Sequence, residues 1–161
     1  AHAPGSNMKL ASGAMPARAM LAAGVPVGLA TDGAASNNNL DLLEEARLAA
    51  LLAKLETGDP TAVSAYEALY MATRGGAEAL GLSDIIGQIA PGYQADIILL
   101  NLQQPHLYPL HDVVSQVIYA ARAGDVRAVL VEGRTLLLNG ELQTIDEERV
   151  MAEPPPAPAA W

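Results

Sequence analysis

Two residues, Asp32 and Ser36, carry reactive side chains just after an apolar segment. Residues 25–30 read V-P-V-G-L-A, which is typical of a short buried strand, and Asp32 follows it closely. A lone carboxylate at such a point is commonly a turn former or a helix cap. In α/β barrels and open sheets, however, catalytic residues sit at the carboxyl ends of strands. Local sequence therefore leaves both roles open for Asp32.

Ser36 lies beyond Asp32 across the bend Gly33-Ala34-Ala35. Its hydroxyl either faces the same cavity as the carboxylate or caps the turn that leads to the next helix. The spacing favours neither role over the other. The asparagines that follow, residues 37–39, are typical of turns and caps.

The chain has few other groups that bind metals or act as nucleophiles. It contains no cysteine and three histidines, His2, His106 and His111, none with the spacing of a preformed metal site. His2 is expected to hydrogen-bond the backbone, with a ligand role as the lesser alternative, and His106 to lie at the surface. No phosphate-binding glycine loop and no G-x-S-x-G nucleophile motif is present.

Composition indicates one globular domain. The 161 residues are 51% hydrophobic, enough for a sizeable core. The net charge of −9, with only nine lysines and arginines, argues against nucleic acid or an anionic membrane as a partner. No apolar run approaches the ~20 residues of a membrane span. No secretory leader opens the chain, and we expect a cytoplasmic protein.

Periodicity and turn signals predict the elements around these residues. An amphipathic helix begins at Leu40, with Asn39 as its cap and leucines up to Leu55 on its apolar face. Residues 1–13 are predicted to be a loop. The other predicted elements are helices at 16–23, 64–73, 76–80, 113–121 and 146–151, strands at 25–30 and 95–100, a hairpin at 128–138 and a flexible Pro-rich tail. For residues 113–121, composition also permits a strand, and the helix is favoured.

Three motifs in order resemble the amidohydrolase superfamily. They are H-A-P-G-S-N-M-K-L-A-S-G (2–13), L-A-T-D-G-A-A-S-N-N (29–38) and G-Q-I-A-P-G-Y-Q-A-D-I-I-L-L (87–100). Within it, the match is closest to 5-methylthioadenosine/S-adenosylhomocysteine deaminases and their chlorohydrolase-like relatives. The opening H-A-P departs from the usual H-N-P or H-C-P of these enzymes.

The resemblance implies an α/β fold that is only the C-terminal part of a larger enzyme. Residues 1–85 would form the end of a metal-dependent (β/α)8 TIM barrel, with its seventh and eighth strands. Residues 86–145 would supply strands of a small β-sandwich with a helix. Residues 146–161 would be a C-terminal helix and tail.

The resemblance also implies roles for the two residues. Asp32 matches an aspartate that binds the catalytic Zn²⁺ and exchanges protons with the hydrolytic water, and Ser36 matches a serine that contacts the substrate. The H-x-H pair, the other histidine ligands and the metal-site glutamate of the family fall in segments outside this chain. The upstream portion of the enzyme is therefore an expected partner, and self-association into a homo-oligomer is expected.

Two classes of function follow from the sequence. The first is zinc-dependent deamination of an adenine nucleoside of the S-adenosylhomocysteine or methylthioadenosine type, with the isolated chain inactive. Guanine, triazine or other amidohydrolase substrates are alternatives within that class. The second is a non-catalytic, self-standing module. In that case the open strand edges and exposed apolar face would promote association.

Overall fold

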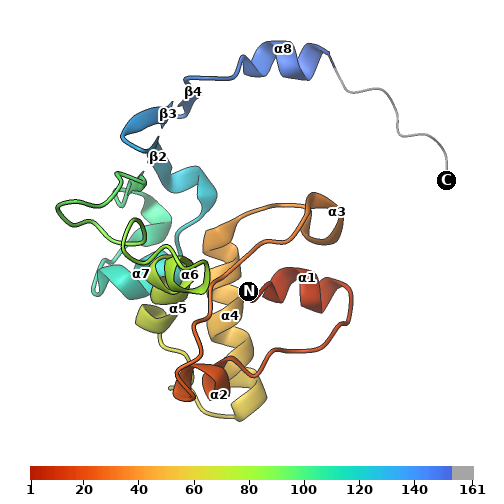
Figure 1. Ribbon diagram of the computed structural model, residues 1–161. Coiled ribbons are helices and arrows are strands. Elements are labelled where there is room, and N and C mark those ends of the chain that lie inside the picture. Colours follow the sequence, from red (N-terminus) through yellow and green to blue (C-terminus); the bar gives the residue numbers. More distant parts are fainter. Residues whose placement is uncertain (154–161) are drawn as a thin grey trace.

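The computed structural model describes residues 1–153, and the predicted Pro-rich tail from Pro154 onward lies outside them. Helices surround the long α4 in one part of the chain, a small sheet follows, and α8 extends away from both (Figure 1). The elements are α1 (Pro4–Lys9), α2 (Ala17–Ala22), α3 (Ala34–Asn37), α4 (Leu42–Thr57), α5 (Ala65–Ala72), α6 (Arg74–Ala79), β1 (Ile97–Leu100), α7 (Val113–Tyr119), β2 (Val126–Val131), β3 (Arg134–Leu138), β4 (Glu141–Leu142) and α8 (Glu147–Ala152), with 3-10 turns at Pro105–Leu107 and Ala123–Asp125.

The predicted amphipathic helix is α4, but its cap is Asp41 and not Asn39. The Asp41 carboxylate accepts hydrogen bonds from the amides of Leu43 and Glu44. Asn39 instead accepts a bond from the Asp41 amide, 3.1 Å long, in a turn before the helix. The helix therefore begins later than predicted, because the first carboxylate able to reach its free amides is Asp41. Gly58, with a φ of 66°, ends it.

Alanines, and not the predicted leucines, form the buried face of α4. The buried alanines share one core with Met71 of α5 and Ile118 of α7. They are Ala46, Ala49, Ala50 and Ala53. Leu51 and Leu55 are 47% and 81% exposed. Small side chains let α4 approach α5 and α7 closely, so the apolar stripe of leucines lies at the edge of the contact and not inside it.

Most of the other predicted helices are confirmed within a residue or two. A capping box formed by Ser64 and Glu67 begins α5, and Asp112 caps α7 through the Ser115 amide at 2.6 Å. Asp146 caps α8 in the same way. Local hydrogen bonds between side chain and backbone thus mark these helix starts.

Residues 1–13 are not the predicted loop, because Pro4–Lys9 forms α1. Proline is favoured in a first helical turn, where its missing N–H costs nothing. The predicted strand at residues 25–30 pairs through a single parallel bridge, between Leu29 and His2. On its other side Leu29 donates its amide to the Met71 carbonyl. Because the end of α5 occupies the place of a second neighbouring strand, the pairing of this segment stays limited to the one bridge among the described residues.

The predicted strand at 95–100 and the hairpin at 128–138 are confirmed as parts of one antiparallel sheet in the order β1-β2-β3-β4. Glu132 and Gly133, with φ of 50° and 76°, make the turn between β2 and β3. The described chain is therefore mixed α/β. None of its helices in residues 1–153 has the length and apolar character needed to cross a membrane.

Candidate active site around Asp32

A backbone bridge between two distant segments builds the site. The His2 amide donates to the Gly28 carbonyl at 2.8 Å, and the Ala30 amide donates to the His2 carbonyl at 2.9 Å. Because the two segments run parallel, the residues that follow each of them emerge at the same end. One segment continues into α1 and the other into Asp32 and α3, so these two short helices lie in contact.

Two serines hold the Asp32 carboxylate. Ser6 of α1 donates its hydroxyl to Asp32 Oδ2 at 2.8 Å, and Ser36 of α3 donates to the same oxygen at 2.6 Å. Ser36 Oγ also lies 3.1 Å from the Gly33 carbonyl. Of the two roles open for Ser36, the structure therefore shows the one in which it faces the carboxylate.

Asp32 is exposed and adopts an uncommon backbone conformation. Its φ of 63° lies in the left-handed region, which aspartate tolerates better than most residues. Such a conformation costs about 1–3 kcal/mol and persists only where the surroundings impose it. The hydrogen bonds from Ser36, then Ser6, then the Gly33 amide hold the pKa of Asp32 below its usual range. The carboxylate is therefore ionised at neutral pH, ready to bind a cation or accept a proton.

Ser6 is the site residue that the sequence reasoning missed. It is 3% exposed and lies in the segment predicted to be a loop. The available signal was Pro4, whose preference for a first helical turn predicts a helix that includes Ser6. Its contact with Asp32 spans 26 residues of sequence and has no local signature.

The three histidines do not gather around Asp32. His2 is 1% exposed, and its Nδ1 is buried without a hydrogen-bond partner among the described residues. Burial lowers the pKa of His2. His106 is exposed, as predicted, and pairs through Nε2 with Asp125 at 2.9 Å. Residues 1–153 contain no group of three His, Cys, Asp or Glu side chains that could hold a metal ion.

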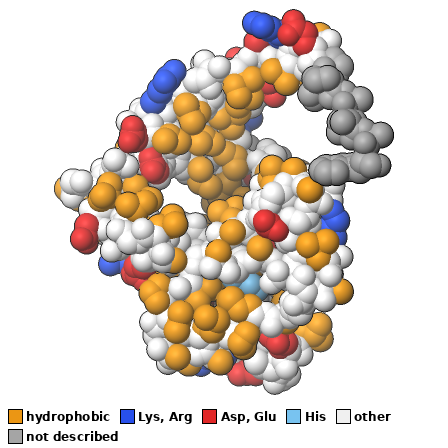
Figure 2. Space-filling view, turned by 45° about the vertical axis from the view of Figure 1, so that its right-hand side comes forward, with side chains coloured by type: hydrophobic (Ala, Val, Ile, Leu, Met, Phe, Trp, Pro, Cys, Tyr) orange, Lys and Arg blue, Asp and Glu red, His pale blue; other side chains and the backbone are white. Residues whose placement is uncertain are grey.

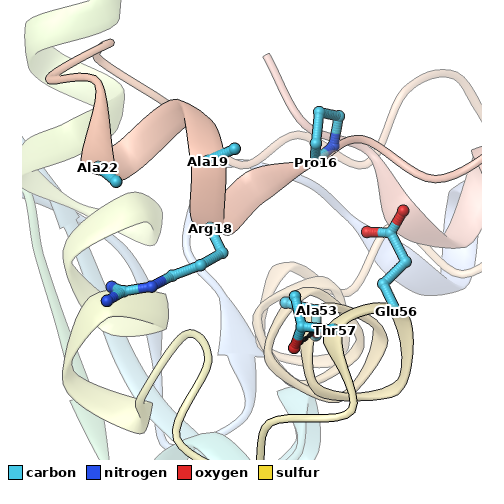
Figure 3. Close-up of a pocket in the computed structure, with 7 residues that line it drawn as sticks. All are labelled: Pro16, Arg18, Ala19, Ala22, Ala53, Glu56 and Thr57. Atoms are coloured by element: carbon cyan, nitrogen blue, oxygen red, sulfur yellow. Dashed lines mark hydrogen bonds between the residues drawn. The ribbon is translucent and has the colours of Figure 1, made fainter.

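A separate cavity of about 270 Å³ lies between α2 and the end of α4 (Figure 3). Its walls include Ala19, Ala22 and Ala53, and its two charged side chains, Arg18 and Glu56, point in different directions. The Arg18 guanidinium already lies 3.4 Å from Glu67. Reactive side chains do not converge on this cavity, so the surroundings of Asp32 are the better candidate for a catalytic site.

Comparison with known proteins identifies the family. Residues 1–136 match the amidohydrolase family. The chain belongs to this family. The amidohydrolase motifs at 2–13 and 29–38 are the segments that carry Ser6, Asp32 and Ser36, so the matched region contains the whole serine–aspartate cluster.

Several family members are close in sequence. The chain is 54% identical over 153 residues to the 5-methylthioadenosine/S-adenosylhomocysteine deaminase of Pelotomaculum thermopropionicum, covering 95% of this chain and 35% of that protein. It is 55% identical to the deaminase of the same name from Moorella thermoacetica, with 95% and 36% covered. The chain thus spans about a third of the length of these relatives.

Solved structures of amidohydrolases have the same fold over this region. An adenosine deaminase from Xanthomonas campestris with bound zinc superposes with a TM-score of 0.92 at 46% identity, covering 94% of this chain and 34% of that one. Atrazine chlorohydrolase from Arthrobacter aurescens, complexed with zinc, gives a TM-score of 0.84 at 35% identity, with 94% and 34% covered.

Proposed function

We propose that this chain is the C-terminal part of a metal-dependent hydrolytic deaminase that acts on adenine nucleosides of the S-adenosylhomocysteine or methylthioadenosine type. The observation that carries the proposal is the ionised Asp32 carboxylate held by Ser6 and Ser36. It stands in a chain whose relatives at 54% and 55% identity are named as such deaminases. Neither a turn nor a helix cap requires two serine hydroxyls from separate helices on one carboxylate oxygen.

Asp32 fits the role of a zinc ligand, but this chain cannot complete the site. An ionised carboxylate is a suitable ligand for Zn²⁺, whereas catalytic zinc takes three or more protein ligands. The described residues 1–153 hold no such group, so the remaining ligands would come from the upstream portion of the enzyme. Bound there, the metal would supply a water whose pKa is lowered toward neutrality. The isolated chain is accordingly proposed to be inactive.

In this role Asp32 transfers protons. Both serine hydroxyls contact Oδ2, so Oδ1 is the oxygen that we assign to the reaction. It accepts a proton from the attacking water and delivers it to the leaving amino nitrogen. Water oxygen replaces the amino group on C6 of the adenine ring and ammonia leaves. Ser36, half-buried beside Asp32, is proposed to contact the substrate as well.

We propose that residues 1–85 complete a (β/α)8 barrel whose other strands lie upstream, that residues 86–145 join a β-sandwich, and that residues 146–161 are a C-terminal helix and tail. The parallel bridge between His2 and Leu29 supports adjacent barrel strands. Ile98 and Leu99 of β1 are 50% and 54% exposed although they point to opposite faces of the sheet. Figure 2 shows hydrophobic side chains gathered on the surface in the upper part of the molecule. Such an exposed apolar patch supports contact with segments that lie upstream in the complete enzyme.

The complete enzyme is proposed to be cytoplasmic and homo-oligomeric. A guanine or triazine substrate is the second candidate. A triazine hydrolase variant and a guanine deaminase superpose with TM-scores of 0.85 and 0.74, at 36% and 30% identity. Both are less similar in sequence than the adenosine deaminase, which favours the adenine nucleoside.

The test measures ammonia release by the complete zinc-loaded protein from S-adenosylhomocysteine, methylthioadenosine, adenosine, guanine and a chlorinated triazine. We expect the adenine nucleosides to react fastest, and Asp32→Asn to abolish activity and reduce zinc content. Asp59→Asn is the matched control, because Asp59 is also an exposed aspartate whose pKa is lowered by hydrogen bonds, here from Thr61. Normal deamination and zinc content in Asp32→Asn would refute the proposal.

A further inference from the structure

A buried carboxylate on α4 contacts both of the short helices that carry the serines. Glu45, in the first turns of α4, is 1% exposed and interrupts the otherwise alanine-rich buried face of that helix. Its Oε2 accepts a hydrogen bond from the Gly5 amide at 2.9 Å, and its Oε1 accepts one from Asn37 Nδ2 at 2.8 Å. No ion pair of the described residues includes Glu45. These two hydrogen bonds satisfy the buried carboxyl group.

Both partners of Glu45 are sequence neighbours of the serines that hold Asp32. Gly5 precedes Ser6 in α1, and Asn37 follows Ser36 in α3. Glu45 thus joins the two short helices through Gly5 and Asn37, while Asp32 joins them through Ser6 Oγ and Ser36 Oγ. The four contacts close a ring, so both Glu45 and Asp32 hold α1 and α3 at a fixed spacing.

The Glu45 contacts leave little freedom. A Cβ on Gly5 would overlap Glu45 Oε1 and lie 3.0 Å from Asn37 Nδ2, so any larger residue there would displace the Glu45 carboxylate. The Asn37 amide is fixed from both ends, because its Oδ1 accepts a bond from the Leu40 amide at 2.9 Å. Its Nδ2 must therefore face Glu45. The Gly5 amide and Asn37 Nδ2 donate to different oxygens of Glu45, so a glutamine in its place would set an NH2 group against one of these donors.

We propose that Glu45 is a positioning residue that sets the distance between Ser6 and Ser36 and so fixes the Asp32 carboxylate for metal binding and proton transfer. The inference rests on the proposed function of Asp32. Glu45 does not contact Asp32 itself. Its effect would be of the kind that hydrogen-bond partners of metal ligands have on metal affinity and activity.

The test uses the complete protein with Glu45→Gln, which keeps the size of the side chain but has one acceptor oxygen for two donors. We expect the zinc Kd to rise and kcat to fall by about 10- to 100-fold, with KM little changed and the protein folded at the assay temperature. Asn37→Ala, which removes one link only, should give a smaller effect in the same direction. Glu44→Gln is the control, since the neighbouring Glu44 contacts Asn39, which does not hold Asp32.

The outcomes separate this inference from the proposed function. Wild-type zinc Kd and kcat in Glu45→Gln, even with a lowered Tm, would show that Glu45 is only structural. If the wild-type protein binds zinc but deaminates no nucleoside, the proposed function fails while the change in zinc Kd still tests Glu45. If the wild-type protein binds no zinc, crystal structures decide. Unchanged distances from Ser6 and Ser36 to Asp32 in Glu45→Gln would overturn the inference, and lengthened ones would support it.

Discussion

Ser6 Oγ lies 2.8 Å from Asp32 Oδ2, although the two residues are 26 positions apart in the chain. The same oxygen also accepts a hydrogen bond from the Ser36 hydroxyl. Asp32 is thereby held from two helices while its backbone has a φ of 63°. These contacts orient the Asp32 carboxylate before any ligand binds.

Replacing Ser6 with alanine should impair chemistry more than folding. Ser6 is one of the two side-chain donors that orient the carboxylate, and a misplacement of about 1 Å can cost about 100-fold in rate, so Ser6→Ala should lower kcat of the complete protein about 10- to 100-fold. Because this bond is one of those that lower the pKa of Asp32, its loss should raise that pKa. The acid limb of the pH–rate profile would then move to higher pH, which steady-state kinetics across the acidic range would measure.

Ser64→Ala is the matched control for Ser6→Ala. Ser64 caps α5 through the Glu67 amide and has no contact with Asp32 among the described hydrogen bonds. Loss of such a cap costs about 1 kcal/mol of unfolding free energy. We therefore expect a lower Tm with wild-type kcat. Equal kcat in Ser6→Ala and Ser64→Ala would contradict the role assigned to Ser6.

The buried Asp125 should make stability depend on acid pH. Burial alone would raise the pKa of Asp125, but hydrogen bonds from His106 and the Arg122 amide outweigh it and hold the pKa below its usual value. A carboxylate with a depressed folded-state pKa stabilises the protein above its unfolded pKa of about 3.9. That contribution is lost as the pH falls through the lower folded-state value.

Asp125→Asn should therefore reduce the free energy of unfolding at pH 7, and the difference from wild type should shrink below pH ~4. Urea unfolding at a series of pH values measures this. Asp84→Asn, at an exposed position, is the control and should leave the pH dependence as in wild type. A constant gap between Asp125→Asn and wild type at every pH would exclude the ionised carboxylate as the cause.

Contact between Gly28 and α6 should limit side-chain size in the segment that leads to Asp32. A Cβ on Gly28 would lie 2.8 Å from Gly76 Cα and 3.7 Å from Ala79 Cβ. Gly28→Ala should destabilise the complete protein by about 1–3 kcal/mol through overpacking, seen as a lower Tm in calorimetry. Gly124→Ala, where a Cβ would meet open space, should leave Tm nearly unchanged. Equal Tm values for the two variants would show that α6 moves aside.

The elements whose signals are local were predictable from the sequence. Asp112 and Asp146 begin helices because their carboxylates reach amides a few residues away, and Glu132-Gly133 turns a hairpin for the same short-range reason. The family motifs likewise indicated Asp32 and Ser36. In each of these cases the interacting groups, or the motif itself, lie within a few residues of one another.

Only the tertiary structure brought the rest of the site together. The bond from Ser6 to Asp32 spans 26 positions and the bond from Gly5 to Glu45 spans 40, so no short window of sequence contains both partners of either bond. The alanine face of α4 was likewise decided by which groups the packed helices could reach. Sequence by itself determined which residues are able to do chemistry here, and packing decided which of them meet, because contact at 3 Å depends on the path of the whole chain.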